Sequence, residues 1–224
     1  MKNEKLYSSQ KLSVKQPEFY TIKGAKPGPV VMITAGVHGT EIAGIMAARK
    51  LINTQISNGM LIIVPIVNQV AYRQRKRGNP DINRTFPRYP GDKPKHPIAD
   101  GILQIAKKFH VTWCIDLHEA NGLYRLDHTK LGQTLIVYPD EKMHRIAKRV
   151  TEKVNQNIQV RLKKFCVRQG KLPGSLRTAM GNVLHLKAIT VETSMQQPKR
   201  LRVQYQTQIV QALLHEIGII TSVL

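Results

Sequence analysis

Short apolar runs alternate along the chain with segments whose apolar residues recur at the spacing of a helix. Five of the runs are rich in Val, Ile and Leu and bounded by turn residues, and they predict strands at residues 30–37, 60–67, 111–117, 133–138 and 187–192. Near-continuous apolar strands are typical of sheets that are covered on both faces. The pattern therefore predicts a buried, mainly parallel sheet.

Two other segments, residues 140–156 and 199–217, carry apolar residues on one helical face. These faces are formed by Met143, Ile146, Ala147, Val150 and Val154, and by Ile209, Val210, Leu213, Leu214 and Ile217. Because strands alternate with helices, we expect an α/β fold with a mixed, mainly parallel sheet and helices on both faces. A length of 224 residues suits a single domain over residues 1–224.

Residues 72–97 carry no apolar period. This stretch holds five prolines, eight Lys and Arg residues and two acids. It is longer than a simple connection, and loops of such length in a compact domain are usually functional or disordered. We therefore expect a long basic loop after the strand at 60–67.

The composition is that of a globular protein, with 42% hydrophobic residues and no apolar run long enough to span a bilayer. The start of the chain, MKNEKLYSSQKLSVKQ, is polar and lacks the apolar stretch of a secretory signal. We therefore expect a cytoplasmic protein with no membrane partner. The two cysteines form neither a disulfide framework nor a metal knuckle, and Cys114 is expected to be a buried thiol.

The chain is strongly basic, with 35 Lys and Arg residues against 14 Asp and Glu residues and a formal net charge of +21. Such a surface attracts anions, so one hypothesis is a protein that binds nucleic acid or another polyanion. Aromatic residues make up only 5% of the chain, however, and no known RNA- or DNA-binding motif is present. Nucleic acid is therefore not the expected partner.

The segment TAGVHGTEIAG holds a histidine and a glutamate three positions apart, where an apolar run gives way to a helical pattern. A helix that starts near Thr40 allows His38 and Glu41 to reach one ion from the turn made by Gly36 and Gly39. Imidazole nitrogen and carboxylate oxygen are both good zinc ligands. Alone, this short pair favours the other interpretation, an ordinary loop histidine and a surface glutamate.

Three further polar segments follow apolar runs. They are CIDLHEA with His118 and Glu119, AITVETS with Glu192, and NPDINRTFP with Asp81, Asn83 and Arg84. In open α/β sheets, ligands bind at the carboxyl edge of the strands, where the strand order reverses. Five of the 14 acids lie in these segments and the first one, namely Glu41, Asp81, Asp116, Glu119 and Glu192. We therefore predict that the segments meet in one site.

Two histidines and one carboxylate, with a fourth position open to water, form the ligand set of a catalytic zinc site. The sequence therefore predicts that His38, Glu41 and His118 bind one Zn²⁺ ion. The remaining histidines have no partner motif, and we expect them to be surface or packing residues. They are His96, His110, His128, His144, His185 and His215.

The order HxxE, DxNR, strand-end histidine and strand-end glutamate resembles the zinc carboxypeptidase superfamily. Within it, GVHGTEIAG, DINRTFP and DLHEA are most similar to the succinylglutamate desuccinylase/aspartoacylase branch. The similarity runs from about residue 30 to residue 195. It implies a zinc carboxypeptidase-like fold, of the phosphorylase/hydrolase-like type, and a zinc-dependent hydrolase acting on C–N bonds.

The resemblance also implies roles for single residues. His38, Glu41 and His118 are then the zinc ligands, and Asp81 supports His38 from behind. Glu192 is the catalytic carboxylate, which takes a proton from water and passes it to the leaving amine. Should Glu192 not be the base, Glu119 is the next candidate.

Two further roles concern the substrate. By the same resemblance, Asn83 and Arg84 bind a substrate carboxylate. An arginine before the DxNR motif polarises the scissile carbonyl. Arg73, Arg75 and Arg77 compete for that role, and we prefer Arg77.

The chain departs from these enzymes in two segments. Succinylglutamate desuccinylases and aspartoacylases continue into a C-terminal β-rich domain, whereas this sequence stops shortly after the helix expected at 199–217. Digestive-type carboxypeptidases carry a tyrosine in the loop before the last catalytic strand, and CVRQGKLPGS has none. We therefore expect an open basic cleft, bordered by residues 72–97 and RQGKLPGS, that suits a peptide-like or polymeric anion.

The favoured hypothesis is a deacylase or carboxypeptidase that cleaves an amide bond in an N-acyl amino acid or peptide with a free carboxylate. The compact length and the LPGS segment are also similar to murein peptide amidases, so an enzyme acting on cell-wall peptides is an alternative. A basic polyanion-binding protein is the alternative from another class. A catalytically inactive relative that serves as a binding module is disfavoured by the complete set of His38, Glu41, His118 and Glu192.

Overall fold

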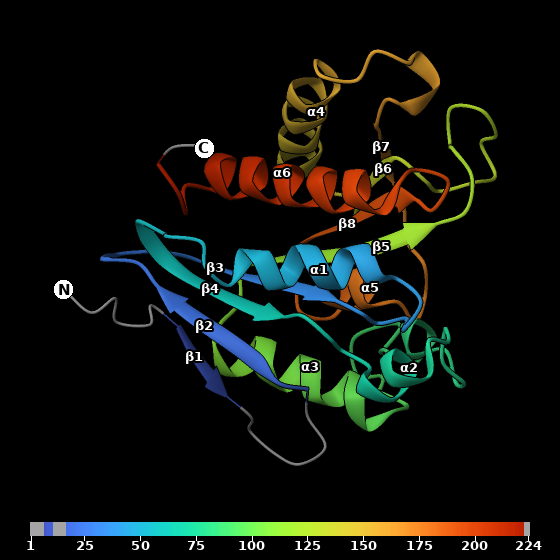
Figure 1. Cartoon of the computed structure of the whole chain (residues 1–224). Coiled ribbons are helices and arrows are strands. Elements are labelled where there is room, and N and C mark those ends of the chain that lie inside the picture. Colours follow the sequence, from blue (N-terminus) through green and yellow to red (C-terminus); the bar gives the residue numbers. More distant parts are fainter. Residues whose placement is uncertain (1–6, 11–16, 222–224) are drawn as a thin grey trace.

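The chain folds around one mixed sheet, which a computed structural model describes over residues 7–10 and 17–221 (Figure 1). Its eight strands lie in the order β1-β2-β4-β3-β5-β8-β6-β7. Their bounds are β1 (Tyr7–Gln10), β2 (Phe19–Lys23), β3 (Lys26–Ala35), β4 (Asn58–Val64), β5 (Trp113–Ala120), β6 (Thr134–Val137), β7 (Cys166–Gln169) and β8 (Lys187–Ser194). The central strands β4, β3, β5 and β8 are mutually parallel, and antiparallel pairs occur only on either side of them. The prediction of a mixed, mainly parallel sheet is confirmed.

Helices cover both faces of the sheet (Figure 1). They are α1 (Ile42–Leu51), α2 (Gln69–Gln74), α3 (Pro97–Lys108), α4 (Glu141–Asn155), α5 (Leu176–Asn182) and α6 (Lys199–Ile217), with 3₁₀ turns η1 (Ile82–Arg84) and η2 (Arg161–Lys163). Helices α1, α4 and α6 pack on one face, and α3 and α5 on the other. None of the helices in the described part of the chain is long and apolar enough to cross a membrane.

The two hydrophobic cores follow from the alternation of side chains along each strand. In β3, for example, Ile33 faces the core of α1, α4 and α6, whereas its neighbour Met32 faces the core of α3 and α5. The same alternation places Ile115 and Cys114 of β5 on opposite faces. A strand that is buried on both faces needs apolar residues at every position, which is why these strands are continuous apolar runs. Cys114 is buried as expected.

The sequence located five of the strands and the helices at 140–156 and 199–217, but it did not indicate strands β1, β2 and β7 or helices α3 and α5. All five predicted strands and the helices expected at 140–156 and 199–217 are present, with shifted ends. Strands β1 and β7 lie at the two edges of the sheet and read YSSQ and CVRQ, so they lack the apolar pattern of a buried strand. The prediction that residues 72–97 form a loop needs correction at both ends. Helix α2 covers its first residues, and α3 begins at Pro97, with His96 as a side-chain cap.

The topology creates a point at which the strand order reverses. From β3 the chain crosses through α1 to β4 on one side, and from β4 it returns through α3 to β5 on the other side of β3. The helices α1 and α3 pack on opposite faces, so the two connections diverge at the carboxyl ends of β3 and β5. Such an edge is where open α/β sheets bind ligands.

Candidate metal centre and active site

The turn between β3 and α1 carries the first two candidate ligands. Gly36 adopts φ +65°, and a side chain on Gly39 would stand 1.9 Å from the carbonyl oxygen of Ala71, so both positions require glycine. This tight turn directs His38 inward and ends at Glu41, the residue immediately before the first turn of α1. Both side chains are only 3% exposed. The helix begins at Ile42, two residues later than the expected start near Thr40, so His38 and Glu41 both lie in the turn that precedes it.

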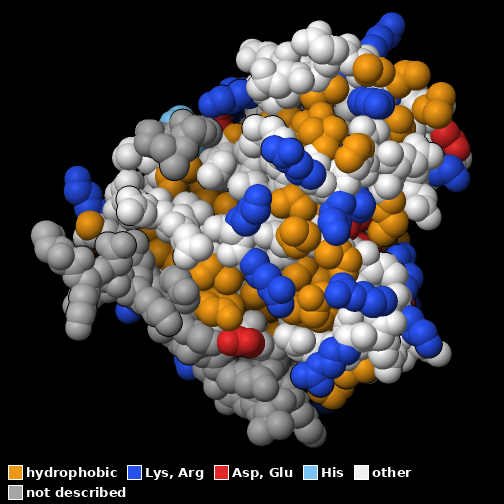
Figure 2. Space-filling view, viewed as in Figure 1, with side chains coloured by type: hydrophobic (Ala, Val, Ile, Leu, Met, Phe, Trp, Pro, Cys, Tyr) orange, Lys and Arg blue, Asp and Glu red, His pale blue; other side chains and the backbone are white. Residues whose placement is uncertain are grey.

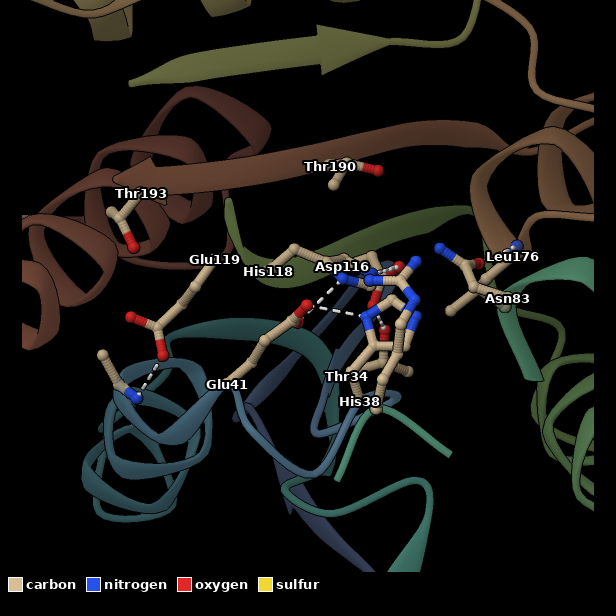
Figure 3. A network of polar contacts seen from close by, with 12 residues as sticks. Thr34, His38, Glu41, Asn83, Asp116, His118, Glu119, Leu176, Thr190 and Thr193 are labelled. Atoms are coloured by element: carbon tan, nitrogen blue, oxygen red, sulfur yellow. Dashed lines mark hydrogen bonds and ion pairs between the residues drawn. The ribbon is translucent and has the colours of Figure 1, made fainter. Parts of the chain in front are cut away.

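His118, in the neighbouring strand β5, completes the group (Figure 3). Its Nδ1 lies 2.9 Å from Glu41 Oε2, and His38 Nδ1 lies 2.6 Å from Glu41 Oε1. One ligand atom from each of the three residues lies within 4.8 Å of the others. We call these three residues the ligand cluster. Within residues 7–10 and 17–221, no other group of three His, Cys, Asp or Glu side chains is close enough to share a metal ion.

A carboxylate lies behind each histidine. Asp81 Oδ1 lies 3.0 Å from His38 Nε2, and Asp116 Oδ2 lies 2.6 Å from His118 Nε2. Asp116 is itself held by Thr34, whose hydroxyl donates to Oδ1 at 2.7 Å. A carboxylate partner on Nε2 keeps the proton there and leaves Nδ1 with its lone pair. Asp116 was given no role from the sequence, although the spacing DxH places both side chains on one face of a strand.

The ligand cluster fits a metal ion. Two Nδ1 atoms and one carboxylate face each other in a buried space, at 2.6 Å for His38 and 2.9 Å for His118. Although burial alone would raise the pKa of Glu41, attraction to His118 and His38 lowers it to about 2. Burial opposes the charge on His118, but Asp116 and Glu41 raise its pKa well above the usual value. The cluster therefore stabilises added positive charge, and its nitrogen and oxygen donors are those that zinc prefers.

Glu192 stands in β8 opposite His118, its partner in the parallel ladder. The side chain is 8% exposed, and its Oε2 has no hydrogen-bond partner in the part of the chain that the structure describes. Burial raises the pKa of Glu192 to about 8, an effect that the charges of Glu41 and Asp116 strengthen and those of His118 and Arg177 oppose. A carboxylate with this pKa can both accept and release a proton near neutral pH.

Arg177 is a buried charge that the sequence analysis overlooked. It lies in α5, is 7% exposed, and donates from Nη1 to the hydroxyl of Thr190 at 2.9 Å. Burial lowers the pKa of Arg177, while the charges of Glu192 and Asp116 raise it. The signal in the sequence was an arginine within the mainly apolar start of α5, LRTAMG, but nothing local indicated which acids lie near it.

A pocket of about 460 Å³ opens over the ligand cluster and Glu192. Its wall includes Arg77, Asn83 and Arg84 from the basic loop and Leu172 from RQGKLPGS, so the expected borders are present. We call Arg77, Asn83 and Arg84 the rim. A larger cavity of about 570 Å³ lies elsewhere, between the ends of α1 and α6, and is lined mainly by neutral polar residues.

Only one of the three candidate arginines lines this pocket. Arg77 does so, and its guanidinium donates to Asp81 Oδ2 from Nε and Nη2 at 3.1 and 2.9 Å. Arg75 instead lies over the ring of Tyr72, 4.6 Å from its centre. Arg73 and Arg75 are both absent from the pocket wall. Of the three candidates, Arg77 is therefore the one that a substrate in this pocket could contact.

Asn83 and Arg84 stand on a turn that packs against the loop before α5. Asn83 Oδ1 accepts a hydrogen bond from the backbone of Leu176 at 2.9 Å, which leaves its amino group available to the pocket (Figure 3). Arg84 donates from Nη1 to the carbonyl of Asn83 at 2.7 Å and is otherwise exposed. Both side chains thus offer N–H donors to the pocket, as binding of a carboxylate requires.

Glu119, the second candidate for the base, is engaged elsewhere. Its carboxylate accepts a hydrogen bond from the backbone of Ala43 at 2.8 Å and pairs with Arg202 of α6. The side chain is fully buried. Glu192, with one oxygen unpaired, is thus better placed to exchange a proton.

The surface has an excess of cations. Figure 2 shows many Lys and Arg side chains and few acidic ones on the face that carries α1, α4 and α6. The ion pairs between Lys or Arg and an acid in the described chain are Arg77–Asp81, Lys130–Asp127, Arg149–Glu216 and Arg202–Glu119. Most of the basic side chains therefore contribute to an uncompensated positive field.

The sequence matches the family model of the succinylglutamate desuccinylase/aspartoacylase catalytic domain over residues 27–214. A curated relative, the N-alpha-acetyl-L-2,4-diaminobutyric acid deacetylase of Halomonas elongata, is 30% identical over 124 residues. That alignment covers 52% of this chain and 33% of the deacetylase.

Solved structures share the fold. The mDAP-bound form of Helicobacter pylori Csd4, a D,L-carboxypeptidase, superposes with a TM-score of 0.71 and 22% identity, over 86% of this chain and 51% of Csd4. The product-bound ectoine utilization protein EutE (DoeB) of Ruegeria pomeroyi superposes with a TM-score of 0.66 and 21% sequence identity, over 92% of this chain and 62% of EutE. The chain thus spans about a third of the curated relative and half to two thirds of these two structures.

Proposed function

The chain belongs to the succinylglutamate desuccinylase/aspartoacylase catalytic-domain family, and from that premise we propose that it is a zinc-dependent hydrolase of amide bonds. The observation that carries the proposal is the ligand cluster with a carboxylate behind each histidine and with Glu192 beside it. A structural zinc site would use four protein ligands, whereas three leave a position for water or substrate. The arrangement therefore favours a catalytic ion.

His38, Glu41 and His118 would hold the zinc ion, which would supply a Lewis acid for the amide carbonyl and for the attacking water near neutral pH. Glu192 accepts the proton of the attacking water and later donates it to the leaving nitrogen. Its pKa of about 8 in the metal-free site reflects burial, and a nearby cation would lower that value toward neutrality. General catalysis of this kind is most effective when the pKa lies near the working pH.

The rim binds and polarises the substrate. Arg77, at the pocket wall, stabilises the charge that develops on the carbonyl oxygen, a type of contact worth about 3 kcal/mol. Asn83 and Arg84 hold a free carboxylate of the substrate, for which the planar guanidinium of Arg84 offers two parallel N–H donors. Asp81 links the ligand cluster to the rim, because it contacts both His38 and Arg77.

We assign the substrate to N-acyl amino acids or peptides that carry a free carboxylate. The relatives named above include a deacetylase of an acetylated amino acid and a D,L-carboxypeptidase, and both names describe hydrolysis of an amide next to a carboxylate-bearing residue. The pocket lies between the basic loop and RQGKLPGS, and a peptide-like anion fits this cationic wall. Cell-wall peptides are therefore the second substrate class to test.

Metal analysis and a substrate screen test the proposal together. We expect close to one zinc ion per purified chain, and hydrolysis of at least one compound among N-acyl amino acids, dipeptides and muropeptides. Removal of the ion with a chelator should abolish the activity, and added zinc should restore it. A chain that binds no metal and cleaves nothing, but binds polyanions in a salt-sensitive manner, would instead support the polyanion-binding hypothesis.

A further inference from the structure

Helix α1 begins without the side-chain cap that helices normally have. Glu41 occupies the cap position, but it makes no side-chain bond to the first turn because its carboxylate faces the two histidines. The first N–H groups of a helix have no partner within the helix, and leaving them unpaired in a buried place is costly. Use of Glu41 in the ligand cluster therefore leaves α1 in need of another acceptor.

Glu119 supplies that acceptor from the neighbouring strand. Its Oε2 accepts the hydrogen bond of the Ala43 N–H at 2.8 Å, and its other oxygen pairs with Arg202. Figure 3 shows this carboxylate pointing toward the first turn of α1, whereas that of Glu41 points toward the histidines. The positive end of the helix dipole adds to the attraction.

The hydrogen bond between Glu119 and Ala43 joins strand β5, which carries His118, to helix α1, which Glu41 directly precedes. Glu119 follows His118 directly in β5, and Ala43 lies two residues after Glu41. Helix α6 also contacts β5 at this point, since Gln206 donates to the carbonyl of His118 at 2.9 Å. Helix α1 also lies tight against β5, where a side chain on Gly44 would stand 3.2 Å from the carbonyl of Leu117. The distance between Glu41 and His118 thus depends on how α1 is held against β5.

We propose that Glu119 is a positioning residue that holds the start of α1, and with it Glu41, at the distance from His118 that a metal ion requires. This inference rests on the proposed function, because it takes the ligand cluster to be a metal site. Arg202 acts behind Glu119 and fixes the orientation of its carboxylate. Outer partners that orient metal ligands typically contribute 10- to 100-fold to metal affinity.

Three substitutions separate this role from a merely structural one. Glu119→Asp keeps the charge but is one methylene shorter, so it cannot reach Ala43 and Arg202 together. Glu119→Ala removes the acceptor, and Glu119→Gln keeps an oxygen that can accept from Ala43 N–H but loses the charge that pairs with Arg202. Zinc affinity is measured by competition with a chromophoric chelator, and the melting temperature of each metal-free variant is measured alongside.

We expect zinc affinity to fall at least about tenfold in Glu119→Asp and Glu119→Ala, and to stay within about threefold of the wild type in Glu119→Gln. The melting temperature should fall in all three, since each weakens the contact with Arg202. Arg149→Met is the control, because it breaks a different ion pair of α6, the one between Arg149 of α4 and Glu216, which involves neither α1 nor β5. It should leave zinc affinity unchanged.

The inference is overturned if Glu119→Asp binds zinc as tightly as the wild type, or if affinity follows the melting temperature across the three variants. Should Glu119→Ala not fold, Glu119→Asp and Glu119→Gln still decide the matter. A wild-type chain that binds no zinc contradicts the proposed function itself. A wild-type chain that binds zinc while Glu119→Asp has normal affinity contradicts only the role of Glu119.

Discussion

At the floor of the pocket, the three residues of the ligand cluster are each only 2% exposed, whereas at its rim the side chain of Arg77 is 54% exposed. Each histidine of the floor has a carboxylate behind it, and Asp116 has Thr34 in turn. At the rim, Arg84 has one bond, to a backbone carbonyl of its own turn. The floor is therefore held in one arrangement by mutual contacts, while Arg84 at the rim can adjust to what it binds.

This difference in exposure suggests that the floor carries out the reaction and that the rim selects the substrate. Charged groups that are excluded from water interact strongly and tolerate little displacement, so the floor suits a metal ion and a proton carrier. Exposed charges are screened, so each contributes less, but a flexible arginine can accommodate carboxylates in several substrates. We therefore expect a larger effect from loss of the proton acceptor at the floor than from Arg84→Lys at the rim, and the following predictions begin with the largest expected effect.

The largest effect is expected from Glu192→Gln. The variant lacks the proton acceptor but retains all three ligands, so kcat should fall about 10²- to 10⁴-fold while zinc content stays the same. Glu216→Gln, which removes an acid paired on the surface with Arg149, is the control and should keep full activity. Nearly normal turnover in Glu192→Gln would show that Glu192 is not the base, and the distinction between floor and rim would lose its main support.

Asp116→Asn and Asp81→Asn should weaken zinc binding to different extents. Asp116 is 1% exposed and supports His118, so its loss should reduce zinc affinity about 10- to 100-fold. The side chain of Asp81 is 23% exposed and should matter less, because solvent screens its charge. Competition with a chelator gives both affinities, and a larger loss for Asp81→Asn would reverse the comparison.

Arg84→Lys tests the rim with the charge kept. An ammonium group cannot make two parallel hydrogen bonds to a carboxylate, so kcat/KM should fall about tenfold, which corresponds to about 1.4 kcal/mol. Arg88→Lys, on the same loop but outside the pocket wall, should have no effect. Wild-type kinetics of Arg84→Lys on a true substrate would mean that Arg84 belongs only to the general positive field.

Glu192 should also make the metal-free protein sensitive to pH. Its pKa is about 8 in the folded chain against an ordinary value of 4.5, so above pH 4.5 the unfolded chain releases this proton more readily than the folded chain does. The contribution of Glu192 to stability is therefore fully present below pH 4.5 and is lost as the pH rises toward 8. Glu192→Gln should raise the melting temperature of the metal-free protein by several degrees at pH 8 and by less at pH 5. Equal shifts at the two pH values would contradict the raised pKa.

The smallest effects are expected from Arg73→Met and Arg75→Met. Neither side chain lines the pocket, so kcat/KM and stability should stay within about twofold and about 0.5 kcal/mol of the wild type. Arg77→Met should lower kcat by about 10²-fold or more by comparison. A large loss in Arg73→Met or Arg75→Met would move the oxyanion role away from Arg77.

Local sequence patterns predicted much of the fold and of the candidate site. The five apolar runs predicted the buried strands, because a strand covered on both faces must be apolar at nearly every position. The same reasoning failed for β1 and β7, whose edge positions impose no such requirement. The turn before α1 was also recognisable, since its glycines and the HxxE spacing lie within a few residues.

The sequence by itself thus determined the fold class and the segments that hold His38, Glu41, His118 and Glu192. Only the tertiary structure decided that Asp116 supports His118, that Arg177 lies near Glu192, and that Arg77 rather than Arg73 or Arg75 lines the pocket. It also turned Glu119 from a candidate base into a partner of Ala43, 76 positions earlier in the chain. Periodicity and motif spacing report on neighbours along the chain, whereas these contacts depend on which strands pair and how far each helix is pressed against the sheet.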